Sequence, residues 1–158
     1  MSSIVQVAFV AAGLRGAQLR ALVPEAGAAT HSSVSHTHGV SAIAWGEVRV
    51  GVDVEIVRAR ARLDRLAART MTTSEHATWR AAPDRQRAFA QHWTRVEAYL
   101  KATGVGVRGG YLTRPPSGWS MIDLDLGHLG VSHVGALAAD AARAAVSVRW
   151  VRAPGTSG

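Results

Sequence analysis

The chain has no cysteine among its 158 residues and a single lysine, Lys101, although its formal net charge is +7. The absence of cysteine excludes disulfide bonds and thiol chemistry, which makes the cytoplasm the expected location. No apolar run approaches the roughly 18 residues that a membrane-spanning helix needs, and no charged lead into a hydrophobic signal segment opens the chain. We therefore expect a cytoplasmic protein with no membrane partner.

Aromatic side chains for stacking on bases are scarce, with two Phe and two Tyr in the whole sequence. The positive charge comes from scattered arginines, and no helix-turn-helix or ribonucleoprotein motif is visible, so we expect no nucleic-acid partner. A basic surface still favours an acidic protein or a phosphate-bearing ligand. A chain of this length, 47% apolar, is expected to form one domain with a sizeable core.

Hydrophobic periodicity predicts a mixture of strands and helices. The longest helix is predicted from about Arg85 to Thr103, started by Pro83-Asp84 and closed by Gly104. Shorter helices are predicted at 14–22, towards the end of 58–69, and after a cap at Thr73 or Ser74, with a loop at 25–33. Strands are predicted at 4–11, in the second half of 34–45 after a turn, and at 48–56, 119–126, 131–139 and 144–151.

These elements predict an α+β fold of two halves, each an antiparallel sheet backed by helix, related by a pseudo-twofold axis. The halves are placed at about 1–48 and 49–151, with a tail at 152–158, and 34–45 is expected to pair with 48–56 as a hairpin. An internal echo supports the duplication: Val34-Ser35-His36 and Val131-Ser132-His133 are each followed by a spacer, a glycine and small apolar residues. Chance remains an alternative in a chain so rich in Ala, Val and Gly.

The strand Val50–Ile56 alternates valine and isoleucine with Gly51, Asp53 and Glu55. One face therefore belongs in a core, and the other presents two neighbouring carboxylates beside a glycine that leaves room for a close approach. Adjacent carboxylates repel, so one must take up a proton or both must share a cation. A strand with one wet, charged face is the simpler alternative.

On the long helix, Trp93, Glu97 and Lys101 recur every four residues and share one face. A surface ion pair between Glu97 and Lys101 would contribute only a few tenths of a kcal/mol. The alternative is that Glu97 joins Asp53 and Glu55 around a metal ion while Lys101 neutralises a phosphate, a task that suits a compact ammonium. That the sole lysine lies here favours the second interpretation.

In this order and separation, Gly51-Val52-Asp53-Val54-Glu55 and Trp93-x-x-x-Glu97-Ala98-x-x-Lys101 resemble the G-[IV]-D-[IV]-E and W-x-K-E-[SA]-x-x-K motifs of the 4′-phosphopantetheinyl transferases. The match is to the two-lobed, surfactin-synthetase-activator type. Ser35-His36 also resembles the Ser-His pair of that type. The resemblance implies transfer of 4′-phosphopantetheine from coenzyme A to a serine of an acyl or peptidyl carrier protein. It implies Mg²⁺ held by Asp53, Glu55 and Glu97.

The resemblance also assigns roles to further residues. Glu97, directly or through a water, would be the general base for the carrier serine, and Lys101 would bind phosphate. Ser35 and His36 would hydrogen-bond the coenzyme A phosphates. The arginines that follow the metal strand are expected to help dock the acidic carrier: Arg58, Arg60, Arg62, Arg65 and Arg69.

The sequence departs from the family pattern in two places. Val96 stands where many relatives have lysine, and only about 34 residues precede the Ser-His pair, so Arg15 and Arg20 are the candidates left for the 3′-phosphate of coenzyme A. A non-catalytic relative that only binds carrier protein or coenzyme A is therefore an open alternative. A monomer is favoured by the echo, with a trimer possible. A zinc site of His31, His36 and His38 is disfavoured by its spacing and by the absence of a credible fourth ligand.

Overall fold

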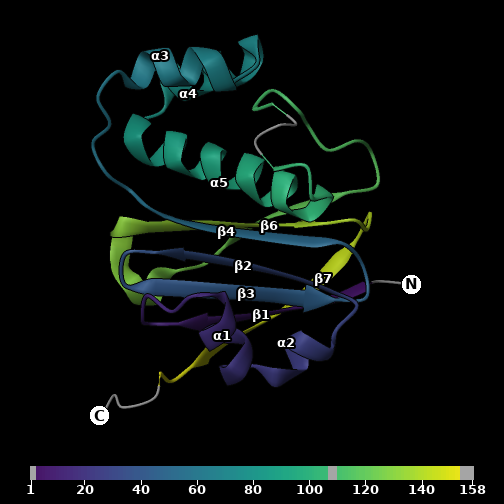
Figure 1. Cartoon of the computed structure of the whole chain (residues 1–158). Helices are drawn as coiled ribbons and strands as arrows, with labels where there is room; N and C mark the ends of the chain where they lie inside the picture. The colour runs from purple at the N-terminus through teal and green to yellow at the C-terminus, as the bar shows by residue number, and fades with distance from the viewer. Residues whose placement is uncertain (1–2, 107–109, 154–158) are drawn as a thin grey trace.

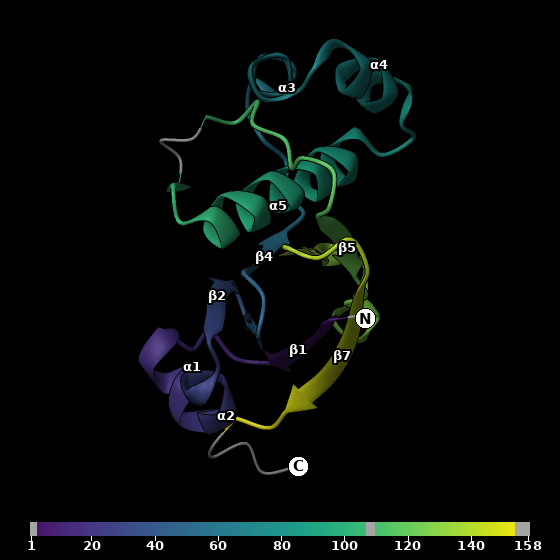
Figure 2. The same cartoon turned by 90° about the vertical axis from the view of Figure 1, so that its right-hand side faces the viewer.

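The molecule, a computed structural model that describes residues 3–106 and 110–153, stacks helices and two β-sheets in layers. Figures 1 and 2 show helices α3 and α4 above α5, then one sheet, then the second sheet, with α1 and α2 below it. This is the α+β architecture that the sequence predicts. None of the described helices is long and apolar enough to cross a membrane.

The first sheet has the strand order β2-β3-β1-β7 and the second has the order β4-β6-β5. All neighbours are antiparallel except β1 and β7, which run parallel. The strands are β1 (Ser3–Val10), β2 (His31–Thr37), β3 (Val40–Gly46), β4 (Val50–Ile56), β5 (Ser120–Leu124), β6 (His133–Ala139) and β7 (Ala144–Val151). The helices are α1 (Gly16–Leu22), α2 (Pro24–Ala28), α3 (Leu63–Thr70), α4 (Thr73–Ala81), α5 (Arg85–Thr103) and the 3₁₀ helix η2 (Gly127–Ser132).

The two sheets repeat one topology, which confirms the predicted pseudo-twofold arrangement. In each sheet, the first strand (β1 or β4) is followed by helices and then by two consecutive strands. The later of these two, β3 or β6, lies in the middle and pairs with both others, which gives the strand orders β2-β3-β1 and β5-β6-β4. The internal echo, however, does not mark equivalent positions in the two halves. Ser35 lies on β2, whose counterpart is β5, whereas Ser132-His133 marks the start of β6, the counterpart of β3. The two Val-Ser-His stretches do not occupy equivalent places.

The main core lies between the sheets, where valines of β1 and β4 and apolar residues of β3, β5 and β6 meet. Val50, Val52 and Val54 all point into it, which confirms the face assigned to them from the alternation. Smaller clusters join α2 to the outer face of the first sheet, α5 to the outer face of the second, and α3 and α4 to α5. Helix α5 therefore lies between two apolar layers.

The predicted hairpin between 34–45 and 48–56 is wrong. All seven residues of β3 are buried, because this strand is central in its sheet and pairs with β1 on one side and β2 on the other. No free edge is left for β4, which pairs with β6 instead. The stretch predicted as a turn is part of β2, and the turn of the actual hairpin is at His38 and Gly39, with Gly39 at φ +76°.

Two smaller expectations also need correction. Residues 25–33, expected to be a loop, contain α2 and the start of β2. The strand expected from Val131 begins at His133, after η2. Residues 154–158 of the expected tail lie outside the described residues.

Gly51 controls how closely α5 approaches β4. A Cβ added at this position would lie 1.9 Å from the carbonyl oxygen of Ala98 and 2.6 Å from the backbone nitrogen of Ala102. No real side chain tolerates such contacts, so the helix packs against the bare backbone of the strand. Glu97 and Lys101 directly precede these two alanines in sequence, so the contact brings both of them to β4.

Replacing Gly51 with alanine should therefore lower the free energy of unfolding by about 2 kcal/mol or more, since α5 must move away from β4. Urea denaturation measures this difference. Gly27→Ala is the matched control, because a Cβ at Gly27 in α2 meets nothing within 4 Å and should be neutral or slightly stabilising. A Gly51→Ala protein as stable as the parent would contradict the close approach.

Candidate functional site

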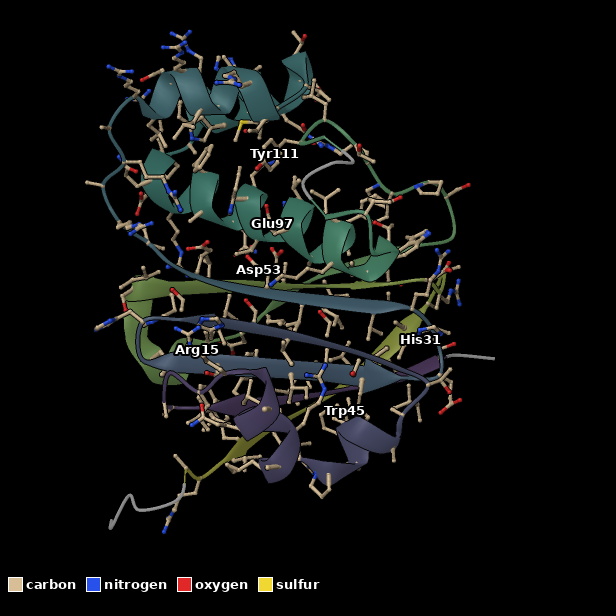
Figure 3. The ribbon with its side chains drawn as sticks, viewed as in Figure 1. Arg15, His31, Trp45, Asp53, Glu97 and Tyr111 are labelled. Carbon is tan, nitrogen blue, oxygen red and sulfur yellow. The ribbon has the colours of Figure 1, made fainter. Side chains whose placement is uncertain are left out.

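Asp53 lies in the contact between β4 and α5, where Figure 3 shows it beneath Glu97. It is 6% exposed, so the alternative of a strand with one wet, charged face is wrong for this residue. Its Oδ1 accepts hydrogen bonds from Ser35 Oγ at 2.8 Å and from Lys101 Nζ at 2.7 Å. Its Oδ2 is also buried and accepts no hydrogen bond from any described residue. A buried carboxylate oxygen without a donor is costly and calls for a functional explanation.

Lys101 is turned towards the strands. Its Nζ donates to Asp53 Oδ1, to the carbonyl oxygen of Val52 at 3.1 Å and to that of Val34 at 3.4 Å. An ammonium has three N–H groups, so these contacts occupy all of them. The lysine therefore pairs with Asp53, a contact that was not predicted, and its contact with a phosphate stays a prediction.

Glu55 and Glu97 complete the acidic group. Both are half-buried, Glu55 on β4 and Glu97 on α5, and within the described residues Glu97 has no hydrogen-bond partner. Burial raises the pKa of Glu97, and the charges of Asp53 and Glu55 raise it further, while Lys101 lowers it. Burial and then Asp53 likewise raise the pKa of Glu55, against the opposing charge of Arg60. Burial raises the pKa of Asp53 despite Lys101 and Ser35.

The three carboxylates thus repel one another in a partly dehydrated site with Lys101 as a local counter-charge. The carboxylates are close enough to affect one another's pKa, but their oxygens are not arranged around one common point as metal ligands would be. Among the described residues, no three His, Asp or Glu side chains are arranged so that they could hold a metal ion.

The residues proposed for coenzyme A are spread more widely. Ser35 is buried, and its Oγ bonds to Asp53 and accepts the backbone N–H of Val54 at 3.2 Å. His36, the next residue of the strand, is exposed on the opposite side. Arg15 and Arg20 are exposed at α1, against the first sheet, and Figure 3 shows Arg15 well away from Glu97. Ser35 is therefore part of the carboxylate site, and the other three are not.

Serine hydroxyls on β2 also join the two sheets. Ser33 Oγ accepts the N–H of Val52 at 3.1 Å, in the same way that Ser35 Oγ accepts that of Val54. These hydroxyls bond the edge of β4 that β6 does not use. Ser33 was not predicted as important, and its only sequence signal is its i, i+2 spacing from Ser35 on a strand.

The arginines after β4 do not all face solvent. Arg58, Arg62, Arg65 and Arg69 are exposed, and the last two flank the buried face of α3. Arg60 turns inwards, with its guanidinium 3.8 Å from Glu55 Oε2 and 5.7 Å from the centre of the Phe89 ring. Arg60 therefore belongs to the charge balance of the carboxylate site.

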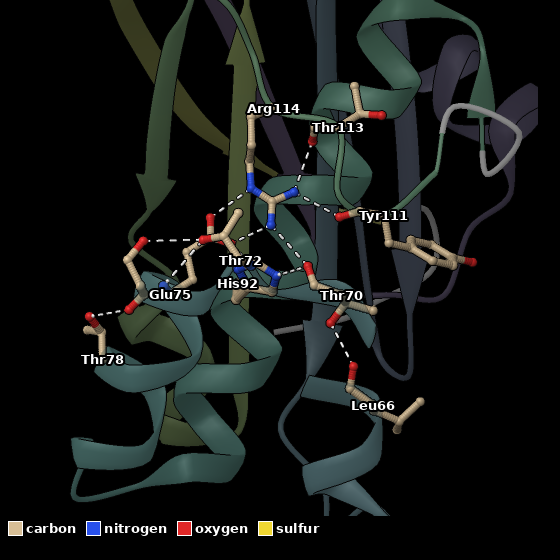
Figure 4. Close-up of polar contacts among 10 residues, drawn as sticks. Leu66, Thr70, Thr72, Glu75, Thr78, His92, Tyr111, Thr113 and Arg114 are labelled. Atoms are coloured by element: carbon tan, nitrogen blue, oxygen red, sulfur yellow. Dashed lines mark hydrogen bonds and ion pairs between the residues drawn. The ribbon is translucent and has the colours of Figure 1, made fainter. Parts of the chain in front are cut away.

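A second polar cluster lies beside α4 and was not predicted (Figure 4). The Arg114 guanidinium donates to both oxygens of Glu75, to the carbonyl oxygens of Tyr111 and Thr113, and to that of Thr70. This ion pair lowers the pKa of Glu75 to about 2. The cluster fastens the segment after α5 to the start of α4, and Tyr111 packs on Trp93 with ring centres 4.8 Å apart.

The predicted cap of α4 at Thr73 or Ser74 is wrong, although the sequence does contain the signal for the actual cap. Thr72-Thr73-Ser74-Glu75 is a capping box, in which Thr72 Oγ1 accepts the N–H of Glu75 and Glu75 accepts the N–H of Thr72. The cap of α4 is therefore Thr72, in place of Thr73 or Ser74.

A cavity of about 570 Å³ lies next to this cluster, between α4, α5 and β5. Its walls on α5 come from His92, Arg95 and Tyr99, which lie on the side of the helix away from Glu97. The cavity is therefore separate from the carboxylates. The zinc alternative also fails on geometry, because His31 and His36 are five residues apart on one strand, or roughly 16 Å.

Comparison with known proteins identifies the family. Residues 49–152 match the model of the 4′-phosphopantetheinyl transferase superfamily, about two thirds of the chain, including both motifs. The chain belongs to this superfamily. The 4′-phosphopantetheinyl transferase HetI of Nostoc sp. (strain PCC 7120) is 37% identical over 78 residues. That match covers 48% of this chain and 33% of HetI, so the chain spans about a third of this relative's length.

A structural likeness was also found to the holo-[acyl-carrier-protein] synthase AcpS of Thermotoga maritima. It covers 58% of this chain and 62% of that one, at 19% identity and a TM-score of 0.45, which is too partial to assign a function. The surfactin-synthetase-activator subtype is not distinguished by these comparisons, and residues 1–48 lie outside the family match.

Because burial and its acidic neighbours disfavour the charged form of Glu97, Glu97→Gln should raise the free energy of unfolding at pH 7 in a buffer with a chelator. A carboxyl with a raised pKa costs stability above its folded pKa, and the cost disappears as pH falls below its unfolded pKa. The gain should therefore shrink towards pH 4. Urea denaturation at both pH values tests this, with the exposed Glu47→Gln as control. A destabilised Glu97→Gln protein at pH 7 would contradict the repulsion.

Proposed function

We propose that the protein is a Mg²⁺-dependent transferase of the surfactin-synthetase-activator type, which moves 4′-phosphopantetheine from coenzyme A to a serine of an acyl or peptidyl carrier protein. One observation carries the proposal: three carboxylates lie on β4 and α5 in a partly buried site, where Asp53 raises the pKa of Glu55 and Glu97 and has one buried oxygen with no hydrogen-bond partner among the described residues. The family membership supplies the class of reaction.

The donors fit Mg²⁺ in kind. Carboxylate oxygens are the side-chain ligands that this ion prefers, and Asp53 Oδ2 is a buried oxygen with no donor of its own. Asp53, Glu55 and Glu97 would hold the ion after their side chains turn towards it, because in the described structure they are not arranged as a set of ligands. When bound, it would neutralise charge on the pyrophosphate of coenzyme A as the 3′,5′-ADP leaves.

Glu97 is the residue best suited to take a proton. It is half-buried and has no hydrogen-bond partner among the described residues, so its carboxylate can accept a proton. A bound Mg²⁺ would keep the pKa of this carboxylate low, which favours transfer through a water. In the proposed reaction the carrier serine oxygen bonds to the phosphorus of the phosphopantetheine and the bond from that phosphorus to the ADP oxygen breaks. The serine proton passes to Glu97, directly or through a water.

Charge on the surface suits both substrates. Arg58, Arg62, Arg65 and Arg69 are exposed beside the site and can attract an acidic carrier protein. The exposed His36 can reach a phosphate without breaking a hydrogen bond that the structure records. Arg15 and Arg20 stay candidates for the 3′-phosphate, and a monomer in the cytoplasm stays the expected state.

The direct test mixes purified protein with coenzyme A, Mg²⁺ and a panel of apo carrier proteins, and measures each carrier by mass spectrometry. A carrier should gain the mass of phosphopantetheine, and chelation should abolish the gain. Asp53→Asn and Glu97→Gln should each reduce the rate by at least about a hundredfold, since each removes charge at the reacting centre.

Asp123→Asn is the matched control, because Asp123 is a carboxylate on β5 that pairs with Arg95 away from the site, through bonds of 2.6 and 2.7 Å. It should transfer at nearly the parent rate. If none of the carriers gains mass, or if Asp53→Asn transfers as fast as the parent, the proposed reaction is wrong.

A second candidate is a relative that binds coenzyme A or a carrier without transfer. The observation in its favour is that Lys101 is fully engaged by Asp53 and two carbonyls, while Val96 is buried where relatives often carry a lysine. Calorimetry showing that coenzyme A binds, with no modification of any carrier, would favour this candidate.

A further inference from the structure

The ammonium of Lys101 pairs with Asp53, the carboxylate that the proposed function assigns to a metal ion. It lies 2.7 Å from Asp53 Oδ1, and the side chain of Asp53 is only 8% exposed while that of Lys101 is 31% exposed. The ammonium is thus the charge that compensates the most deeply buried carboxylate of the site. Removing either partner alone would leave a buried charge unpaired.

The same carboxylate cannot serve two cations equally well. Asp53 Oδ1 already accepts from Ser35 Oγ and Lys101 Nζ, and the ammonium is further held by the carbonyls of Val34 and Val52. A divalent ion on Asp53 would weaken the attraction of the carboxylate for the ammonium and would repel the ammonium directly. The side chain of Lys101 is the more exposed of the two, at 31% against 8%, and it is longer and more flexible than that of Asp53 on β4.

We propose that Lys101 is a resident cation that occupies Asp53 while no divalent ion is bound, and that ion binding releases its ammonium from Asp53. This inference rests on the proposed function, because it takes Asp53 to be a ligand of the divalent ion. It resolves the conflict between two roles of one lysine. The hydrogen-bonded state keeps the buried carboxylate paired, and the released state provides free N–H donors for a phosphate oxygen.

The release gives the site an order of events. Before the ion arrives, none of the three N–H groups of Lys101 is free for a ligand. After it arrives, the freed ammonium adds a positive charge where the pyrophosphate is to bind. The ion should therefore strengthen the binding of coenzyme A by more than its own contact with the phosphates provides.

The single lysine of the chain makes the state of this side chain directly observable. Protein labelled with ¹⁵N-lysine contains one side-chain ammonium, and NMR detects its protons when hydrogen bonds shelter them from exchange with water. In metal-free protein we expect one such signal. Saturating Mg²⁺ without coenzyme A should shift it strongly or broaden it beyond detection, and added coenzyme A should give a signal at a new position.

Backbone amide shifts of the carboxylate residues report ion binding in the same samples. If the amides of Asp53, Glu55 and Glu97 shift with Mg²⁺ while the ammonium signal stays unchanged, the proposed release is wrong and the metal site stands. If these amides do not respond to Mg²⁺, with or without coenzyme A, the metal site of the proposed function is itself wrong and the release with it.

Lys101→Met gives an independent measure, because it keeps an apolar side chain of similar length and removes the charge. Without coenzyme A, this variant should bind Mn²⁺ about tenfold or more tightly than the parent, the equivalent of one charge-assisted hydrogen bond that no longer has to be broken. Electron paramagnetic resonance measures free Mn²⁺. The same variant should also bind coenzyme A more weakly than the parent protein does.

Ser35→Ala is the matched control. It removes the other hydrogen bond to Asp53 Oδ1 but no positive charge, so its affinity for Mn²⁺ should not rise. A Lys101→Met protein that is folded by circular dichroism and binds Mn²⁺ no more tightly than the parent would overturn the inference. If that variant fails to fold, the NMR titration of the parent protein decides the question by itself.

Discussion

The contact between a helix and a strand at Gly51 sets the distances on which the site depends. Ala98 and Ala102 of α5 rest on the bare backbone of β4, and the residues before them, Glu97 and Lys101, are carried to the strand by this contact. A helix held off by one more methyl group would leave Lys101 short of Asp53 and leave the buried carboxylate unpaired. Packing of small residues therefore determines the electrostatics of the site.

The three carboxylates lower the stability of the folded state. Burial raises the pKa of all three carboxyls, repulsion by Asp53 raises that of Glu55 and Glu97 further, and one buried oxygen of Asp53 has no donor among the described residues. Lys101, Ser35 and Arg60 offset part of this cost from three different elements. Such unrelieved charge is typical of sites that acquire their missing partner on binding a ligand. The Arg114–Glu75 cluster, in contrast, is fully bonded and serves to fasten a loop.

Local signals made some of this structure predictable. Helix α5 has the predicted bounds because Asp84 caps one end and Gly104, at φ +73°, closes the other. The two faces of β4 follow from the alternation of its residues, and the family follows from two spaced motifs. In the candidate site, the sequence indicated that Asp53, Glu55, Glu97 and Lys101 act together.

The remainder depends on contacts between distant residues. Strand β2 was predicted as loop and turn because its serines and histidines lack a strand-like composition. The role of its hydroxyls depends on the edge of β4 beside them. The pairing of β3 with β2 depends on the sheet as a whole. The direction of Lys101, the inward turn of Arg60 and the Arg114 cluster depend on side chains brought together by folding, which no periodicity encodes.

The last strand of the chain completes the first sheet. Strand β7 lies parallel to β1 along its whole length, from Ser3 beside Ala144 to Val10 beside Val151, and Trp150 packs on Phe9 with ring centres 5.1 Å apart. A ribosome making this chain must therefore reach β7 before β1 acquires its second neighbour. Until then one edge of β1 is open, so the N-terminal sheet cannot reach its final form ahead of the carboxylate-bearing half. The two halves repeat one topology, yet they mature together.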